Sequence, residues 1–176
     1  MELKEKLLSY FFEEPEREFH VRELAKLLKK SPTTISKYLN LLKKEQLLVS
    51  SEKLNHLLFK ANVNKKFKDF KLNYNLSLIR DSGLLDYLKD KFNYPEAIVL
   101  FGSFAKAENI KKSDIDILVV SPIKKKIELK EFEKNTGHEI QIFIYSGKEL
   151  FSLKNKELLN SFINGIVLEG YIEVIK

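Results

Sequence analysis

Two aspartates separated by one residue stand in the stretch LFGSFAKAENIKKSDIDILVV, residues 100–120. Asp114 and Asp116 fall in a run of β-branched residues, and alternate side chains along a strand point to the same face. Carboxylates that share a face near the end of a strand can converge on a divalent cation, and Mg²⁺ prefers such oxygen ligands together with substrate phosphates. We therefore predict a metal site here. The alternative is a pair of helix-capping or surface aspartates.

A second group of residues, upstream of the aspartates, has the chemistry to hold phosphate. Gly102 and Ser103 directly follow the apolar run AIVLF and are expected to open a short helix. Free backbone N–H groups and a hydroxyl at such a turn can bind a phosphate oxygen, and glycine lets the phosphate approach the backbone. Together with the aspartates, these residues predict a site for a nucleoside triphosphate with Mg²⁺.

The spacing of these residues resembles a known signature. Gly-Ser, ten residues and Asp-x-Asp is the pattern of the nucleotidyltransferase superfamily of DNA polymerase beta type, and specifically of its minimal nucleotidyltransferases. The resemblance implies nucleotide binding by Gly102, Ser103 and Lys106, and metal binding by the two aspartates. Family members often have an Arg-Gly pair where this chain has Lys106 and Ala107. The loop here therefore keeps a cation and lacks a flexible residue.

Active members of this superfamily place a third carboxylate on a later strand, where it binds metal or helps to deprotonate the attacking hydroxyl. In GHEIQIFIYS, residues 137–146, the candidates are Glu139 and Gln141, which share one face of the expected strand. Glu139 would complete a catalytic set with Asp114 and Asp116. An amide in that position can act neither as a base nor as a strong metal ligand, and would leave a site that binds a nucleotide without transferring it. The sequence leaves both alternatives open.

The N-terminal residues predict three helices. The first stops at Pro15, the second ends near Lys30, and the third begins with Ser31 as its cap and Pro32 in its first turn, where a missing N–H is harmless. The apolar stripes expected to form the core of this region are Leu3, Leu7, Leu8, Phe11 and Phe12; Val21, Leu24, Leu27 and Leu28; and Ile35, Leu39 and Leu42.

The third of these helices has a polar, basic outer face. Two helices joined by a tight turn, with hydroxyl residues at the start of the second, are typical of a recognition helix that enters the major groove of duplex DNA. The residues expected to contact DNA bases or phosphates are Thr33, Thr34, Ser36, Lys37, Tyr38, Lys43 and Lys44.

The segment that follows, residues 46–62, predicts two strands around a turn near residues 52–55, which would form a wing. With the preceding helices it resembles the winged helix-turn-helix domains of small prokaryotic regulators. Gln46 stands where these domains commonly have a glycine, and the wing tip has one lysine, Lys53, in place of an arginine cluster. The alternative is a winged helix that mediates only dimerisation or protein contacts.

The chain as a whole is expected to be of the α+β class. We predict a winged helix-turn-helix DNA-binding domain at residues 1–62, a helical connector at 63–94, and a mixed α/β nucleotidyltransferase-like domain at 95–176. The last domain is expected to include a helix near 148–162 and a final strand within 165–175, which adds to the sheet or pairs with another chain.

The charge is unevenly distributed along the chain. Residues 1–62 carry 12 Lys and Arg against 9 Asp and Glu, residues 63–94 carry 7 against 4, and residues 95–176 carry 12 against 12. The basic front half of the chain therefore suggests that this half holds any polyanion. The alternative is that the chain uses lysine only for solubility.

The two resemblances together are those of archaeal-type proteins that fuse these modules. They imply a DNA-binding transcription regulator whose second domain binds a nucleoside triphosphate and transfers a nucleotide to a protein or small acceptor. The alternative is a non-catalytic, antitoxin-like scaffold that binds a partner protein with a HEPN domain. A homodimer is expected by analogy with readers of paired DNA half-sites.

The chain has no cysteine and no apolar run of bilayer length. We therefore expect no disulfide and no thiolate metal site, and a cytoplasmic location without a membrane span.

Overall fold

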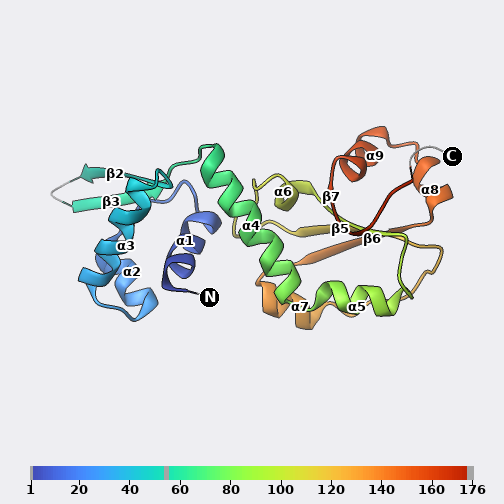
Figure 1. Cartoon of the computed structure of the whole chain (residues 1–176), viewed down its shortest axis with the longest axis horizontal. Coiled ribbons are helices and arrows are strands. Elements are labelled where there is room, and N and C mark those ends of the chain that lie inside the picture. Colours follow the sequence, from blue (N-terminus) through green and yellow to red (C-terminus); the bar gives the residue numbers. More distant parts are fainter. Residues whose placement is uncertain (1, 54–55, 174–176) are drawn as a thin grey trace. The chain divides into compact units, whose positions relative to one another are not determined.

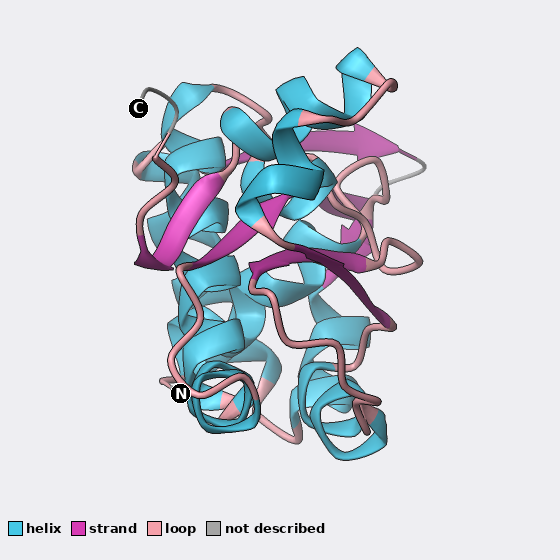
Figure 2. Cartoon of the chain, turned by 90° about the vertical axis from the view of Figure 1, so that its right-hand side faces the viewer, coloured by secondary structure: helices cyan, strands magenta, loops and turns pink. Residues whose placement is uncertain are grey.

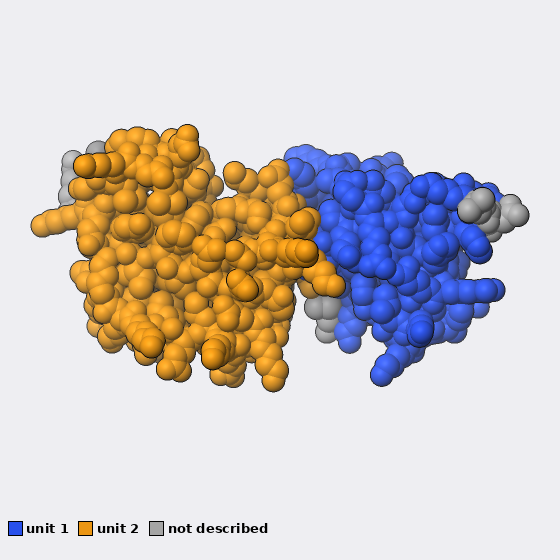
Figure 3. Space-filling view, turned by 180° about the vertical axis from the view of Figure 1, so that it is seen from behind, with its two compact units in different colours: residues 1–71 blue, residues 72–176 orange. Residues whose placement is uncertain are grey.

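The computed structural model describes residues 2–53 and 56–173. The chain is of the α+β class and folds into two compact units, which divide between Lys71 and Leu72 (Figures 1 and 3). This division falls inside helix α4 (Lys65–Asp81), so the stretch expected to be a connector contributes to both units. The boundaries at 62 and 94 stay a prediction.

Within the described residues, unit 1 contains three complete helices, the first part of α4 and a small antiparallel sheet of strand order β1-β3-β2. Leu7 and Phe11 of the first helix, Leu24 of the second and Leu39 of the third are fully buried, so the apolar stripes form the predicted core. The turn expected at 52–55 includes residues 54 and 55, which lie outside the described residues. The elements are α1 (Leu3–Glu13), β1 (Phe19–His20), α2 (Val21–Leu28), α3 (Pro32–Lys44), β2 (Leu48–Lys53) and β3 (His56–Ala61).

For one residue of unit 1, the predicted place in the core is wrong. Leu27 is 49% exposed, whereas Ala25 is 5% exposed. Leu24 and Ala25 are the buried residues of this short helix, and with Val21 and Leu28 they give the i, i+3, i+4, i+7 spacing of one helical face. Leu27 lies at the side of that face, so its apolar side chain is exposed and did not indicate burial.

The two ends of α3 are fixed by local hydrogen bonds. At the start, the hydroxyl of Ser31 accepts a hydrogen bond from the backbone N–H of Thr34 (3.1 Å), with proline in the first turn. At the end, the N–H of Leu47 donates to the carbonyl of Leu42 (2.9 Å), and Gln46 adopts the left-handed conformation with φ of 62°. This closure normally employs glycine, which gives the physical reason why glycine is common at the position of Gln46.

Unit 2 is built on a four-stranded sheet of order β6-β5-β4-β7. Strand β4 is antiparallel to both of its neighbours, and β5 runs parallel to β6. Helices lie on both sides of this sheet (Figure 2). The remaining elements are α5 (Leu84–Lys91), β4 (Ala97–Phe101), α6 (Gly102–Ala105), β5 (Ile115–Val120), α7 (Lys130–Thr136), β6 (Ile140–Tyr145), α8 (Gly147–Phe151), α9 (Lys156–Ile163) and β7 (Ile166–Gly170).

The C-terminal part of unit 2 differs from the prediction in one respect. The single helix expected near 148–162 is two helices, α8 and α9, because the side chain of Asn155 caps a new helix by accepting a hydrogen bond from the N–H of Leu158 (3.0 Å). The final strand β7 pairs with β4 and thus adds to the sheet. The end of the expected strand, residues 174 and 175, lies outside the described residues.

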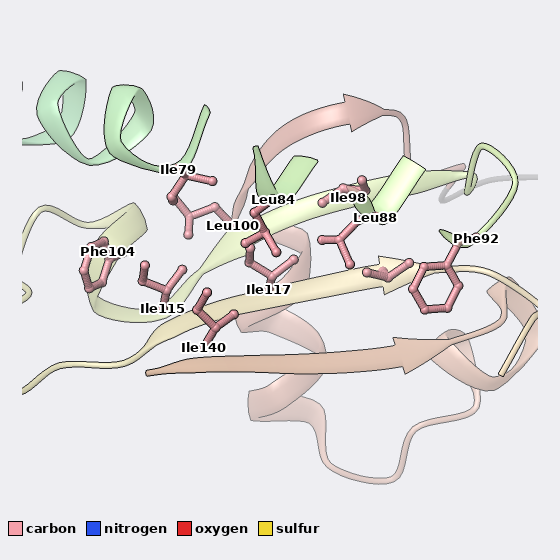
Figure 4. Packing of buried hydrophobic residues seen from close by; sticks show 11 residues of the cluster. Ile79, Leu84, Leu88, Phe92, Ile98, Leu100, Phe104, Ile115, Ile117 and Ile140 are labelled. Atoms are coloured by element: carbon pink, nitrogen blue, oxygen red, sulfur yellow. The ribbon is translucent and has the colours of Figure 1, made fainter. Parts of the chain in front are cut away.

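The two faces of the sheet have separate cores. Ile115, Ile117 and Val119 of β5 pack on one face with residues of α4 and α5 (Figure 4). Leu118 and Val120 pack on the other face with Leu150 of α8 and Phe162 of α9. Strand alternation therefore places Asp116 on the face that α8 and α9 cover. Within the described residues, no helix is long and apolar enough to cross a bilayer.

Candidate nucleotide and metal site

The segment of Gly102 and Ser103 meets the aspartates at one end of the sheet of unit 2. The antiparallel register of β4 and β5 pairs Phe101 with Asp116, and Gly102 follows at once. A Cβ atom on Gly102 would lie 2.2 Å from Oδ2 of Asp116, and Gly102 has a φ of 71°. Glycine is therefore required here both by the close approach of the carboxylate and by the backbone conformation.

The two carboxylates influence each other. Asp114 directly precedes β5 and Asp116 lies within it, and both are half-buried. Burial raises the pKa of Asp116 above its ordinary value, and the negative charge of Asp114 raises it further. A divalent cation between the two groups would remove this repulsion, so the pair has the chemistry of a metal site.

Gln141 lies beside the aspartates. It pairs with Asp116 in the parallel ladder of β5 and β6, and its Nε2 donates a hydrogen bond to Oδ2 of Asp114 (2.6 Å). Glu139 is exposed and precedes β6, and its backbone carbonyl accepts a hydrogen bond from the N–H of Ile115 (2.8 Å). No hydrogen bond in the described part of the chain joins the Glu139 side chain to either aspartate.

Among residues 2–53 and 56–173, no group of three or more histidine, cysteine, aspartate or glutamate side chains could hold a metal ion. Two carboxylates supply only part of the oxygen ligands of Mg²⁺, which commonly binds between carboxylates and substrate phosphates.

The other predicted nucleotide-binding residues follow Gly102 closely in the chain. Ser103 is the second residue of α6 and is half-buried, whereas Lys106 directly follows the helix and is exposed. Ala107 has a φ of 53°, the left-handed conformation in which glycine is favoured. Ala107 stands where family members often have the glycine of an Arg-Gly pair. Its backbone conformation is one that suits glycine.

Residues that the sequence did not reveal support the backbone around the site. Nδ1 of His138 lies 2.9 Å from the carbonyl oxygen of Ser113, which directly precedes Asp114. The buried Asn75 donates hydrogen bonds to the carbonyl of Phe104 (2.9 Å) and to Oδ1 of Asn109 (2.8 Å). These residues are far apart in the sequence and follow no periodic pattern, so no signal in the chain pointed to them.

The predicted DNA-binding residues lie on or near the surface of α3. Lys37, Lys43 and Lys44 are exposed and form no salt bridge within the described residues. The hydroxyl of Thr34 lies 2.8 Å from Oγ of Ser31, so it takes part in the cap of the helix. Thr33 is also exposed, and Thr34, Ser36 and Tyr38 are half-buried.

The basic residues of the small sheet are paired, unlike those of α3. Nζ of Lys53 lies 2.7 Å from Glu18, and Lys60 forms an ion pair with Glu16. Strands β2 and β3 therefore offer less free positive charge than α3.

Comparison with known families assigns a large part of the second unit. Residues 82–164 match the family model described as nucleotidyltransferase domain, and this range includes Gly102, the two aspartates and Gln141. Comparisons with curated proteins and with solved structures give no match. The family match and the meeting of the Gly-Ser and Asp-x-Asp segments at one end of the sheet agree, and residues 82–164 form a nucleotidyltransferase domain.

Proposed function

We propose that the nucleotidyltransferase domain binds a nucleoside triphosphate together with Mg²⁺. The observation that carries this proposal is the close approach of Gly102 to the carboxylate of Asp116, since it puts the Gly-Ser segment next to the aspartate pair. Asp114 and Asp116 would hold Mg²⁺, and the backbone of Gly102 and the hydroxyl of Ser103 would hold phosphate. The metal, when bound, offsets the negative charge of the phosphates and polarises the phosphorus–oxygen bonds.

Calorimetric titration of ATP, GTP, CTP and UTP with and without Mg²⁺ tests this proposal. We expect metal-dependent binding to the wild type and its loss in the double variant Asp114→Asn/Asp116→Asn. Asp90→Asn is the matched control, because Asp90 is an exposed aspartate on α5, away from the aspartate pair. Absence of nucleotide binding by the wild type would overturn the proposal.

The fate of the bound nucleotide depends on the residue beside the aspartates. We propose that Glu139 serves as the third carboxylate if the domain transfers a nucleotide to a protein or small acceptor. A second function is favoured by the hydrogen bond from Gln141 to Asp114. With an amide in that position the domain would bind nucleotide without transferring it and act as an antitoxin-like scaffold for a HEPN-type partner protein.

Label transfer from radioactive nucleoside triphosphates, with the protein itself and cell extract as acceptors, separates these two functions. Transfer by the wild type that disappears in Glu139→Gln would assign catalysis to Glu139. Transfer that is absent in the wild type and appears in Gln141→Asp would show that the amide prevents catalysis. Glu131→Gln is the matched control, because Glu131 is an exposed glutamate on α7.

We further propose that unit 1 binds duplex DNA through α3, as a transcription regulator would. Residues 1–71 carry 16 Lys and Arg against 10 Asp and Glu, and residues 72–176 carry 15 against 15. The entire positive excess of the chain therefore lies in unit 1, which supports its contact with a polyanion. The free lysines of α3 and the paired lysines of the small sheet favour the helix as the main contact.

Fluorescence anisotropy with labelled duplex DNA at several salt concentrations tests this assignment. Lys37→Glu should weaken binding and make the dependence of affinity on salt less steep by roughly one charge or more. Lys125→Glu makes the same charge change at an exposed lysine of unit 2 and should leave binding nearly unchanged. Equal effects of the two variants would show that α3 is not the recognition helix.

A further inference from the structure

The loop that joins α6 to the aspartates contains one buried polar side chain. In this loop, residues 106–113, Glu108 and Ile110 are exposed, whereas Asn109 between them is only 1% exposed. A buried amide costs free energy unless it is hydrogen-bonded. The hydrogen bonds of Asn109 therefore indicate what holds this loop in place.

Asn75 of α4 hydrogen-bonds with Asn109. Nδ2 of Asn75 donates to Oδ1 of Asn109 (2.8 Å), and Nδ2 of Asn109 lies 3.4 Å from Oδ1 of Asn75. The same Nδ2 of Asn75 also donates to the carbonyl of Phe104 (2.9 Å), the third residue of α6. Asn75 is fully buried. Its amide therefore ties the end of α6 to the middle of the loop.

The far end of the loop is fixed as well. The N–H of Ser113 donates to the carbonyl of Ile110 (2.8 Å), and Oγ of Ser113 accepts a hydrogen bond from the N–H of Ile110 (2.9 Å). These two bonds close a turn, which Asn109 directly precedes and Asp114 directly follows. The position of Asn109 therefore sets where the turn begins and, through it, where Asp114 lies.

We propose that Asn75 and Asn109 are positioning residues of the candidate site. They act through the backbone of α6 and of the loop, and so hold the Gly-Ser segment and Asp114 in the relative position that binds Mg²⁺ and phosphate. This inference rests on the proposed binding of Mg²⁺ and nucleoside triphosphate at Gly102 and the aspartates.

The energetics of buried amides support a role in positioning. Two buried polar groups that bond to each other add little net stability over apolar groups of the same shape. A satisfied polar pair is directional, however, and rigidifies one arrangement of the segments that carry it. Within the described residues, no buried side-chain nitrogen or oxygen atom lacks a hydrogen-bond partner. The pair therefore meets the condition under which a buried polar network specifies a single arrangement.

The test is calorimetric titration of ATP, GTP, CTP and UTP with Mg²⁺ into the wild type and Asn75→Leu/Asn109→Leu, with urea denaturation of both proteins. Leucine has the branching of asparagine without its hydrogen-bonding groups. We expect the double variant to keep most of its stability and to bind nucleotide about tenfold more weakly, as when a residue behind the ligand-binding groups is changed. A merely structural role would lower the stability and leave the affinity of the folded protein unchanged.

Leu88→Ala is the matched control. Leu88 of α5 is fully buried, and Figure 4 shows it beside Ile98, at the other end of the cluster from Phe104. The cavity left by alanine should lower the stability, while the affinity for nucleotide stays that of the wild type. If the double variant does not fold, Asn109→Ala, which changes only the loop, takes its place with the same expected loss of affinity.

The outcomes separate the two levels of the proposal. A loss of affinity in the double variant, with the affinity of Leu88→Ala unchanged, would support the positioning role. Unchanged affinity in the folded double variant would overturn this role and leave the nucleotide site standing. An equal loss in Leu88→Ala would assign the effect to lowered stability and would also overturn the role. If the wild type binds none of the four nucleotides, the proposed nucleotide site is wrong, and this inference with it.

Discussion

At the scale of single residues, Gly102 has the most demanding position in the candidate site. Any side chain there would meet the carboxylate of Asp116, since a Cβ atom would lie 2.2 Å from Oδ2. The same residue also has a positive φ. Gly102 therefore combines a backbone requirement with a steric one, and the two can be separated experimentally.

Gly102→Ala should abolish binding of Mg²⁺ and nucleotide, because the added methyl group displaces the Asp116 carboxylate. It should also lower the free energy of unfolding by about 1 kcal/mol or more through backbone strain. Gly137→Ala is the control: Gly137 has a φ of 77°, but nothing lies within 4 Å of its added Cβ. This control should show a similar loss of stability with nucleotide binding intact. Calorimetric titration and urea denaturation of both variants measure the two effects.

The raised pKa of Asp116 gives a pH-dependent prediction. Because the folded protein holds this proton more tightly than the unfolded chain, the metal-free protein loses stability as the pH rises from about 4 through the raised pKa. Asp116→Asn should remove this loss and raise the unfolding temperature at pH 7. Thermal denaturation between pH 4 and 7 without metal is the measurement. An unchanged pH profile in Asp116→Asn would show that neither burial nor the charge of Asp114 raises the pKa of Asp116 in the folded protein.

At the scale of secondary-structure elements, the turn that follows α3 contains backbone strain that another residue type would relieve. Gln46 has a φ of 62°, and its carbonyl accepts hydrogen bonds from the side chains of Asn62 and Asn64, both at 2.9 Å. These contacts involve the backbone of Gln46 and need no particular side chain. These hydrogen bonds therefore stabilise the left-handed conformation of residue 46, although glutamine adopts it at a steric cost.

Gln46→Gly should raise the free energy of unfolding of unit 1 by about 1 kcal/mol, because glycine adopts a positive φ without steric cost. Gln46→Ala is the control, since alanine keeps the Cβ atom that causes the strain and should bring no gain. Chemical denaturation of the three proteins gives the comparison. A gain in the alanine variant equal to that in the glycine variant would assign the effect to the glutamine side chain.

Helix α4 carries a buried cation. Lys71 is 2% exposed, and its Nζ donates a hydrogen bond to the carbonyl of Phe12 (2.8 Å). Burial lowers the pKa of Lys71 from its ordinary 10.5 to about 8. The folded protein therefore binds fewer protons than the unfolded chain between these two pH values, so its stability rises with pH across that window.

The gain in stability from this group between pH 8 and 10.5 should be at most about 3 kcal/mol. Lys71→Met should remove it, whereas Lys65→Met, which changes an exposed lysine of the same helix, should not. Guanidinium denaturation at pH 7, 8, 9 and 10 follows the difference between the proteins. If the wild type and Lys71→Met show parallel pH profiles, Lys71 is charged across the whole range.

At the scale of the whole molecule, the positive net charge lies in unit 1 and the nucleotidyltransferase domain lies in unit 2. Unit 1 holds the positive excess and unit 2 has none. We therefore expect binding of duplex DNA to the full chain to weaken roughly tenfold or more between about 50 and 200 mM salt, through release of counterions. Binding of Mg²⁺ and ATP should change much less over the same range. Parallel anisotropy and calorimetric titrations measure both, and equal salt dependence would contradict the division.

Much of this arrangement could be predicted from local patterns in the sequence. The alternation in the DIDILVV segment predicted a strand in which Ile115, Ile117 and Val119 share one face, and these three residues indeed pack together. The strand begins at Ile115, so Asp116 lies within it and Asp114 directly precedes it. Cap residues such as Ser31 marked helix ends, as the structure confirms. The chain determines these features by itself because backbone periodicity and capping involve only residues that are close in sequence.

Tertiary structure alone decided which residues meet. Glu139 and Gln141 share a strand face, so only the register of β5 and β6 brings the amide of Gln141 to Asp114. The register of β4 and β5 likewise places Gly102 against Asp116, and packing between distant segments brings His138 to Ser113. Register and packing depend on the fit of the whole core, and a strand's own sequence does not specify the residue opposite it.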